Sequence, residues 1–253
     1  RCSVGEPTAF HNEALLYKLF GVNAELLIDH AWGWEPCAIA DIKAYKPESN
    51  SISSGQVLQC PYTYEKACLV IREMADLLTL DLVDKGLMTD QIVLTVGYDI
   101  DNLNGNNTAS YDGDVTTDFY GRKVPKHAHG TANLGRHSSS TRLITAAVLD
   151  LFDRIVDPAL LVRRLNFSAN HIIPEGEAAA EPVFEQLDLF TDYAALQKKR
   201  QEEKIFLQKE RRMQKALLTI QKRYGKNAIL KGTNLQEGAT TQQRNRQIGG
   251  HKA

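Results

Sequence analysis

Residues 64–98, YEKACLVIREMADLLTLDLVDKGLMTDQIVLTVGY, decide the fold class because they join a helix pattern directly to a strand pattern. Gly86 is a suitable stop for the helix. Residues 91–98 then alternate apolar residues with small or polar ones, which is typical of a strand with one buried face. The apolar residues of the helix part recur at the i, i+3, i+4 spacing that buries one stripe: Cys68, Ile71, Met74, Ala75, Leu78 and Leu82.

A related pattern surrounds this stretch. A strand candidate at 51–59 precedes it, and a strand at 131–137, a helix at 138–156 and a strand at 160–171 follow it. The order strand, helix, strand, strand, helix, strand predicts an α+β domain over 51–173. We expect a βαββαβ unit with a four-stranded sheet and two helices on one face.

The sheet face away from the helices is predicted to be polar, mildly basic and poor in bulky side chains. A nucleic-acid backbone could lie there, because small side chains let main-chain amides approach phosphates. A solvated face of a structural domain is the alternative. An RNA-binding sheet would need exposed aromatics for stacking, and the pattern places none there. The residues expected on this face are Thr95, Gly97, Arg164, Asn166 and Ser168, with Ser51, Ser53 and Ser54 at one edge.

The chain before this domain predicts a separate helical unit. Residues 1–42 read as two short helices joined at Gly21 and Val22, with Asn23 as the N-cap of the second. Such a helix-hairpin-helix shape can aim backbone N–H groups at a phosphate. A plain αα-hairpin that only packs is the alternative.

The chain after it differs in charge. Residues 191–253 hold 15 Lys/Arg against 5 Asp/Glu, whereas residues 1–190 hold 15 against 26. Residues 193–224 read as one long basic helix that docks on the body, on a missing domain or on DNA, or stays solvated. Residues 232–253 lack a core-forming pattern and are expected to be mobile. The predicted divisions are 1–42 (helical unit), 43–50 (linker), 51–173 (sheet domain), 174–192 (linker) and 193–253 (basic helical or disordered tail).

Composition sets further limits. The hydrophobic share of 43% permits an ordinary core, and no apolar run approaches the ~18 residues that span a bilayer. Residue 1 is Arg rather than Met, so we expect a piece of a longer protein. The spacing of the cysteines favours unpaired thiols in a reducing compartment over a metal or redox site. They are Cys2, Cys37, Cys60 and Cys68.

Residues 99–129 form a long irregular stretch with two groups of polar residues. Its clustered aspartates resemble fragments of a calcium loop but lack the full ligand spacing. Its second group is a basic cluster, which we expect to be solvated or to face phosphate. A metal site using His127 and His129, with His137 beyond, is the alternative. The basic cluster comprises Arg122, Lys123, Lys126, His127 and His129.

Several short motifs occur in an order that is specific as a set. They are FGVNA at 20–24, NSISSG at 50–55, GTANLGRH at 130–137, RRLNFS at 163–168, KGTNLQEGA at 231–239 and RNRQIGGHK at 244–252. The chain thereby resembles the later part of a Y-family translesion DNA polymerase of the bacterial UmuC/DinB-like kind. The first motif is similar to the second helix-hairpin-helix of that family's thumb. The next three are similar to its little-finger domain, and the last two to the ending of bacterial members.

The resemblance implies contacts with duplex or primer–template DNA, since the family's little finger lies in the major groove and its thumb grips the minor-groove side. It also implies a cytoplasmic, nucleoid-associated protein. In the thumb the implied DNA-binding residues are Gly21, Val22 and Asn23. In the little finger they are Ser51, Ser53, Ser54, Gly55, Arg136, His137, Arg163 and Arg164, with Arg122, Lys123 and Lys126 in a loop longer than usual.

Catalysis is not expected from this chain alone. The family's carboxylates, which hold two Mg²⁺ ions, belong to a palm that precedes the thumb. The sequence offers no such cluster, so we assign it no catalytic residue, no metal site and no bound cofactor. Mg²⁺ and the missing palm and fingers are expected in a full-length polymerase. A stand-alone, non-catalytic DNA-binding or regulatory protein is the alternative.

The run Gln186, Leu187, Asp188, Leu189, Phe190 sits in an Ala/Glu-rich segment that offers its apolar residues no obvious core. It matches the Gln-Leu-x-Leu-Phe form of bacterial sliding-clamp-binding peptides. The resemblance implies a pocket that buries the Leu and Phe side chains. Burying such anchors stabilises a complex by roughly 1.5–3 kcal/mol each, so we expect the sliding clamp as a second partner.

Overall fold

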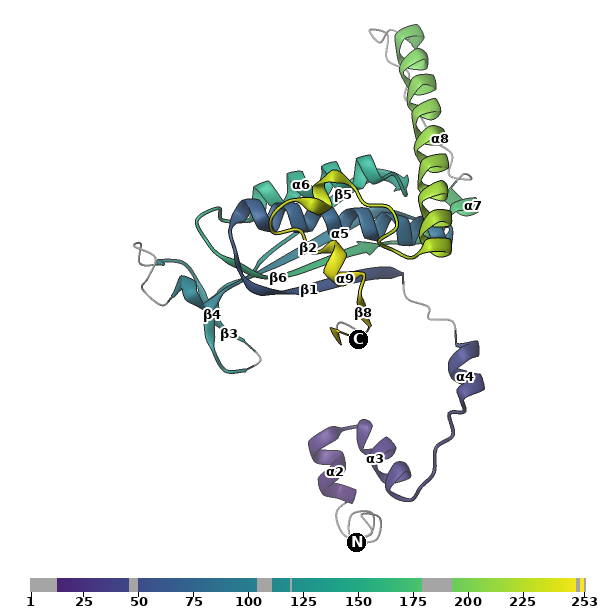
Figure 1. Cartoon of the computed structure of the whole chain (residues 1–253). Helices are drawn as coiled ribbons and strands as arrows, with labels where there is room; N and C mark the ends of the chain where they lie inside the picture. The colour runs from purple at the N-terminus through teal and green to yellow at the C-terminus, as the bar shows by residue number, and fades with distance from the viewer. Residues whose placement is uncertain are drawn as a thin grey trace. The chain divides into compact units, whose positions relative to one another are not determined.

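The computed structural model describes residues 13–45, 50–103, 111–118, 120–178, 193–248 and 251–252 (Figure 1). The chain divides into two compact units, Arg1–Glu48 and Ser49–Ala253. No helix among the described residues is long and apolar enough to cross a membrane.

The first unit contains the predicted helix pair, α2 (Glu13–Phe20) and α3 (Asn23–Ala31), followed by α4 (Ile39–Ala44). Gly21 joins the pair with a φ of +57°, a conformation that favours glycine. The sequence predicted Asn23 as the N-cap of the second helix, and this prediction is wrong. The helix begins one residue earlier than expected, so Asn23 is its first residue and Val22 is the N-cap, without a side-chain hydrogen bond.

The first unit buries little of its apolar surface. Among its described residues, Ala24 is buried, whereas Leu19 and Leu26 are 63% and 55% exposed. Trp34 and Ile39, beside and within α4, are exposed as well. These helices therefore have no closed core of their own.

The second unit is built on an antiparallel sheet in the order β1-β6-β2-β5. Figure 1 shows the two long helices, α5 and α6, on the same side of it. The α+β class predicted from the sequence is confirmed. In chain order the elements are β1 (Ser51–Tyr62), α5 (Tyr64–Lys85), β2 (Leu87–Tyr98), β5 (Ala128–Ser138), α6 (Thr141–Ile155) and β6 (Val162–Asn170), and β7 (Ile173–Pro174) pairs with the start of β2.

The core lies between the sheet and the two helices. Alternate residues of β2 and β6 point into it, as at Leu94 and Phe167, which pair across the two strands. Phe152 of α6 packs from the helix layer. Gly130 of β5 leaves room for α6, because a Cβ there would lie 2.9 Å from Cδ1 of Leu151, which would then have to move.

A hairpin that the sequence did not predict lies between β2 and β5. It pairs β3 (Val115–Thr117) with β4 (Lys123–Pro125), after the short helix η1 (Ile100–Asn102). Asn102 fixes the base of this insertion, because its amide donates to the Leu161 carbonyl and accepts from the Leu161 N–H at 2.9 and 2.8 Å.

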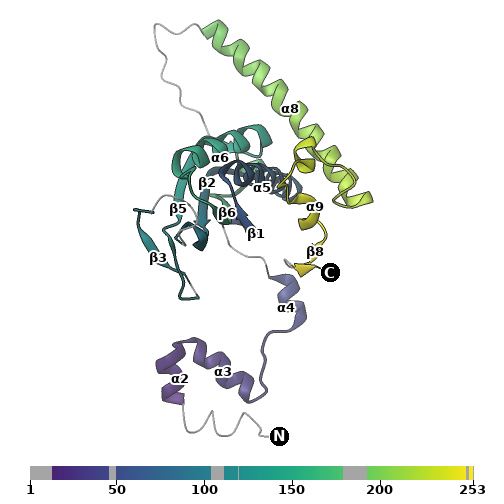
Figure 2. The ribbon, with the colours of Figure 1, turned by 60° about the vertical axis from the view of Figure 1, so that its left-hand side comes forward.

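The basic tail packs on the body. Figure 2 shows part of α8 (Tyr193–Tyr224) beside α5. Glu210 of α8 accepts from Ser140 Oγ at 2.5 Å and from the Arg142 N–H at 3.0 Å at the start of α6. This carboxylate supplies acceptors that a helix N-terminus otherwise lacks.

The end of the chain also contacts the body. Between Lys231 and Arg246 it follows α5 towards β1, where the sequence predicted a mobile segment. These contacts are polar. The sequence of this segment therefore lacks the apolar pattern from which docking on the body could have been predicted. The remaining elements are α7 (Glu175–Ala178), η2 (Gly232–Leu235), α9 (Thr241–Arg244), β8 (Gln247–Ile248) and β9 (His251–Lys252).

Candidate nucleic-acid interface

The sheet of the second unit has one face away from α5 and α6, here called the open face. Strand register defines its members, because residues paired across strands share a face. One row across the sheet is Gly55, Asn166, Thr95 and His129. The open face comprises Ser51, Ser53, Gly55 and Val57 of β1, Arg164, Asn166, Ser168 and Asn170 of β6, Gln91, Val93, Thr95 and Gly97 of β2, and His129, Thr131 and Asn133 of β5.

Small and amide side chains dominate this face, and hydrogen bonds order several of them. Thr95 Oγ1 lies 2.9 Å from Nδ1 of His129. The Gln91 amide donates to Asn133 Oδ1 at 3.1 Å and accepts from Asn170 at 3.2 Å. The open face therefore presents an ordered polar surface without aromatic side chains, to which a backbone can come close.

Arg164 is the arginine of the open face. It is exposed, and no hydrogen bond or ion pair joins its side chain to another residue in the described ranges. Gly97 lies opposite it, where a Cβ would come 3.2 Å from the Cβ of Arg164. The glycine leaves the space that the base of the arginine occupies.

Comparison with known families decides what this domain is. The model of the impB/mucB/samB family C-terminal domain matches residues 49–189. The chain belongs to this family. The matched region is the C-terminal region of Y-family DNA polymerases, so the resemblance seen in the sequence is confirmed. No curated protein matches the sequence.

In this Y-family domain two other predicted arginines are tied to carboxylates. Arg136 pairs with Glu203 of α8 at 2.5 Å, and this guanidinium lowers the pKa of Glu203. Arg163 lies 3.6 Å from the buried Asp99 and donates to the Gln59 carbonyl at 3.1 Å. Both arginines therefore make contacts within the chain.

Two cations of the predicted basic cluster on the inserted hairpin are also paired with carboxylates. Arg122 pairs with Asp118 at 2.7 Å and lowers the pKa of that carboxyl, and Lys126 pairs with Asp114 at 2.9 Å. Lys123 is exposed and has no ion pair within the described part of the chain. Asp114, one of the aspartates that suggested a calcium loop in the sequence, is thus the partner of Lys126.

Of two further predicted residues, one lies away from the open face and the other is largely buried. Ser54 pairs with Phe167, which is a core residue, so it belongs to the helix side of β1. His137 has a side chain only 13% exposed and lies 3.9 Å from Asp90. Period-two alternation shows that Ser53 and Ser54 must face opposite ways, but two serines give no signal of which faces outward.

The described residues contain no group of three His, Cys, Asp or Glu side chains that could hold a metal ion. His129 instead binds Thr95. The hypothesis of a metal-dependent enzyme using His127 and His129 therefore gains no ligand set from this part of the chain.

The turn of the first unit has the properties expected for phosphate contact. Val22 is 83% exposed. The N–H groups of Val22 and Asn23 donate to no backbone acceptor among the described residues, whereas the Gly21 N–H is bonded to the Tyr17 carbonyl. Both free groups lie at the N-terminus of α3, where a helix favours anions.

Sequence reasoning missed the contribution of β5 to the open face. His129, Thr131 and Asn133 alternate with Ala128, Gly130 and Ala132. That alternation was visible in the sequence and could have identified them. The predicted clamp-binding residues, Gln186 to Phe190, lie outside the described residues.

Proposed function

We propose that the second unit grips duplex primer–template DNA through its open face, as part of an error-prone Y-family polymerase acting in translesion synthesis and DNA repair. The observation that carries this proposal is the polar, aromatic-free open face with the exposed, unpaired Arg164. Its polar groups suit phosphate and sugar contacts, which fix position without reading sequence.

The test is fluorescence anisotropy with labelled duplexes of unrelated sequence over a series of salt concentrations. Backbone contacts predict similar affinities for all duplexes and a steep loss with salt, because bound cations release counterions from DNA. A strong preference for one duplex sequence would contradict this backbone grip.

We further propose that the first unit is part of a thumb whose apolar helices pack against neighbouring polymerase segments. The exposed apolar side chains of α2, α3 and α4 support this, because such a surface requires a partner. The same surface argues against a stand-alone regulatory protein. In this proposal the palm and fingers come from a longer polymerase, and the palm carboxylates hold the Mg²⁺ that phosphoryl transfer needs.

Co-expression with a palm-containing segment of such a polymerase tests the thumb proposal. Burial predicts that the apolar residues of α2 and α3 become protected from chemical labelling in the complex. Labelling that stays unchanged in a folded complex would contradict it.

We also propose that Gln186, Leu187, Asp188, Leu189 and Phe190 dock this protein on the bacterial sliding clamp. The match to the clamp-binding form supports this, with Leu189 and Phe190 as the apolar anchors. Changing Leu189 and Phe190 to Ala should abolish retention on immobilised clamp, with Leu196→Ala and Leu207→Ala as controls for the loss of apolar bulk. Undiminished retention would contradict the clamp proposal.

A further inference from the structure

Strand β1 forms one edge of the sheet and pairs only with β6 among the described strands. The Gly55 carbonyl accepts a hydrogen bond from Arg244 at 3.2 Å, so its main chain points away from β6. In an antiparallel strand alternate residues share this direction. The main-chain groups of Ser53 and Val57 therefore also point outward and are available for pairing.

Between Ser51 and Val57 the sequence of β1 does nothing to discourage such pairing, since Pro61 and the irregular register with β6 lie beyond this stretch. Its twelve residues, SISSGQVLQCPY, contain no charged side chain. Natural edge strands are usually shielded by charges, proline, bulges or a covering segment. The covering segment here is 231–246, named the strap.

The strap is anchored at Glu73 of α5, which is 2% exposed. Its carboxylate accepts from Asn234 Nδ2 and the Thr240 N–H, both at 2.7 Å, and from the Thr241 N–H at 3.2 Å. These hydrogen bonds offset the free-energy cost of burying a carboxylate, and all of their donors belong to the strap. Without the strap, Glu73 would lose these partners.

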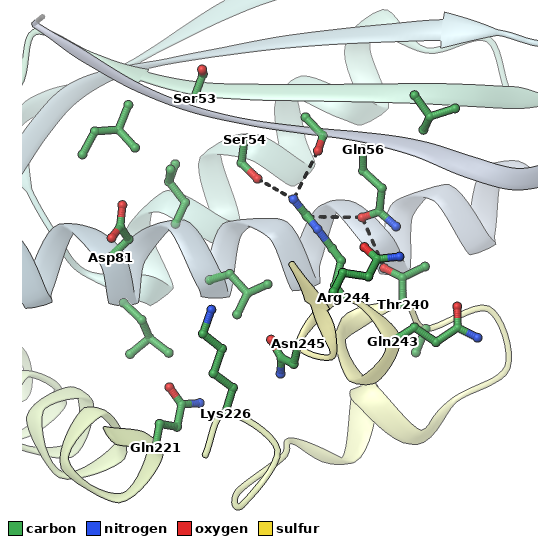
Figure 3. Close-up of a pocket in the computed structure, with 18 of the residues that line it drawn as sticks. Ser53, Ser54, Gln56, Asp81, Gln221, Lys226, Thr240, Gln243, Arg244 and Asn245 are labelled. Atoms are coloured by element: carbon green, nitrogen blue, oxygen red, sulfur yellow. Dashed lines mark hydrogen bonds between the residues drawn. The ribbon is translucent and has the colours of Figure 1, made fainter. Parts of the chain in front are cut away.

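The strap ends on the edge itself. Figure 3 shows Arg244 directed at β1, where it donates to Ser54 Oγ at 3.0 Å and to Gln56 Oε1 at 3.3 Å, besides the Gly55 carbonyl. Arg244 makes no ion pair with a carboxylate in the described part of the chain, and burial lowers its pKa. Arg244 therefore donates its hydrogen bonds to main-chain and side-chain acceptors of β1.

The cover leaves space beside the strand. A cavity of about 1260 Å³ lies between β1, α5, the end of α8 and the strap, and β1 lines it from Ile52 to Cys60. Val57 at its margin is 65% exposed. An extended segment can thus approach β1 once Arg244 moves aside.

We propose that the strap closes the outer edge of β1, and that releasing it opens this edge to antiparallel pairing with β1 of a second copy of the chain. The uncharged, small-residue edge is self-complementary, since no like charges would meet across the two-fold axis. The strap therefore keeps the Y-family domain monomeric.

Sedimentation velocity over a range of protein concentrations tests this. The full chain is expected to be monomeric, and the double variant Glu73→Ala/Arg244→Ala to form dimers at concentrations about tenfold lower or more. Arg246→Ala is the matched control, because Arg246 is an exposed arginine of the strap whose side chain makes no hydrogen bond to the described residues.

A third change identifies the surface. Ser53→Pro removes an outward N–H of β1 but no bond to β6, so it should return the double variant to monomers. Dimers that persist with Ser53→Pro would overturn the proposal, as would monomers at all concentrations when proteolysis shows the strap released. If Glu73→Ala prevents folding, Arg244→Ala alone gives the same reading, because it leaves the core untouched.

Discussion

Among the described residues, charged side chains are buried and hydrogen-bonded on one side of the sheet, and exposed and unpaired on the other. On the helix side, Glu73 and Glu210 are buried and fully engaged with the strap and with the start of α6. On the open side, Arg164 is exposed and without a partner among the described residues. Charge on the helix side holds the chain together, whereas charge on the open side remains available for a partner. Counting cations in the sequence cannot make this distinction.

The largest expected difference between the sides is in stability. Phe167→Ala removes a fully buried ring from the helix side and should lower the free energy of unfolding by about 3–5 kcal/mol. Asn166→Ala, one residue earlier on the open side, should change it by about 0.5 kcal/mol or less. Urea denaturation measures the free energy of unfolding of both variants. Equal losses of stability would contradict the proposed difference between the two sides of the sheet.

The next effect concerns the anchored carboxylate. Glu73→Ala leaves strap donors without acceptors and should lower the free energy of unfolding by about 2–3 kcal/mol. Arg72→Ala, an exposed neighbour on the same helix, is the control. A loss no larger than that of the control would show that the strap contributes nothing to stability.

A pH effect is expected on the helix side. Burial and a hydrogen bond to Asp153 raise the pKa of Tyr64 from 10.0 to about 12. Between these pH values the folded state keeps a proton that the unfolded state releases, so stability should fall as pH rises through this window. Tyr64→Phe should remove this part of the fall. Identical pH profiles for the two proteins would contradict the role of Tyr64.

The smallest effect is on DNA binding by the open side. Arg164→Ala should weaken duplex binding about three- to tenfold and reduce the salt slope by about 0.9, as expected for one lost phosphate contact. Arg212→Ala removes an equal charge from the exposed surface of α8 and serves as control. An unchanged salt slope would mean that Arg164 contacts no phosphate.

The sequence predicted the core well because burial leaves a periodic signal. The i, i+3, i+4 stripe of α5 and the alternation of β2 both proved to be buried residues, such as Ile71 and Leu94. Polar contacts leave no such signal. Arg136 and Glu203 are 67 positions apart, and the strap is held at Glu73 by amides and main chain, which no apolar pattern marks. Four predicted DNA-binding cations were therefore found in intramolecular ion pairs.

The most direct test of the DNA grip compares one added negative charge on each side of the molecule. Asn166→Asp places a carboxylate on the open face with almost no change in shape, and Gln208→Glu does the same on the exposed surface of α8. Anisotropy at one salt concentration should show duplex affinity reduced about tenfold, or ~1.4 kcal/mol, by Asn166→Asp alone. Equal affinities for the two variants would contradict a DNA grip by the open face.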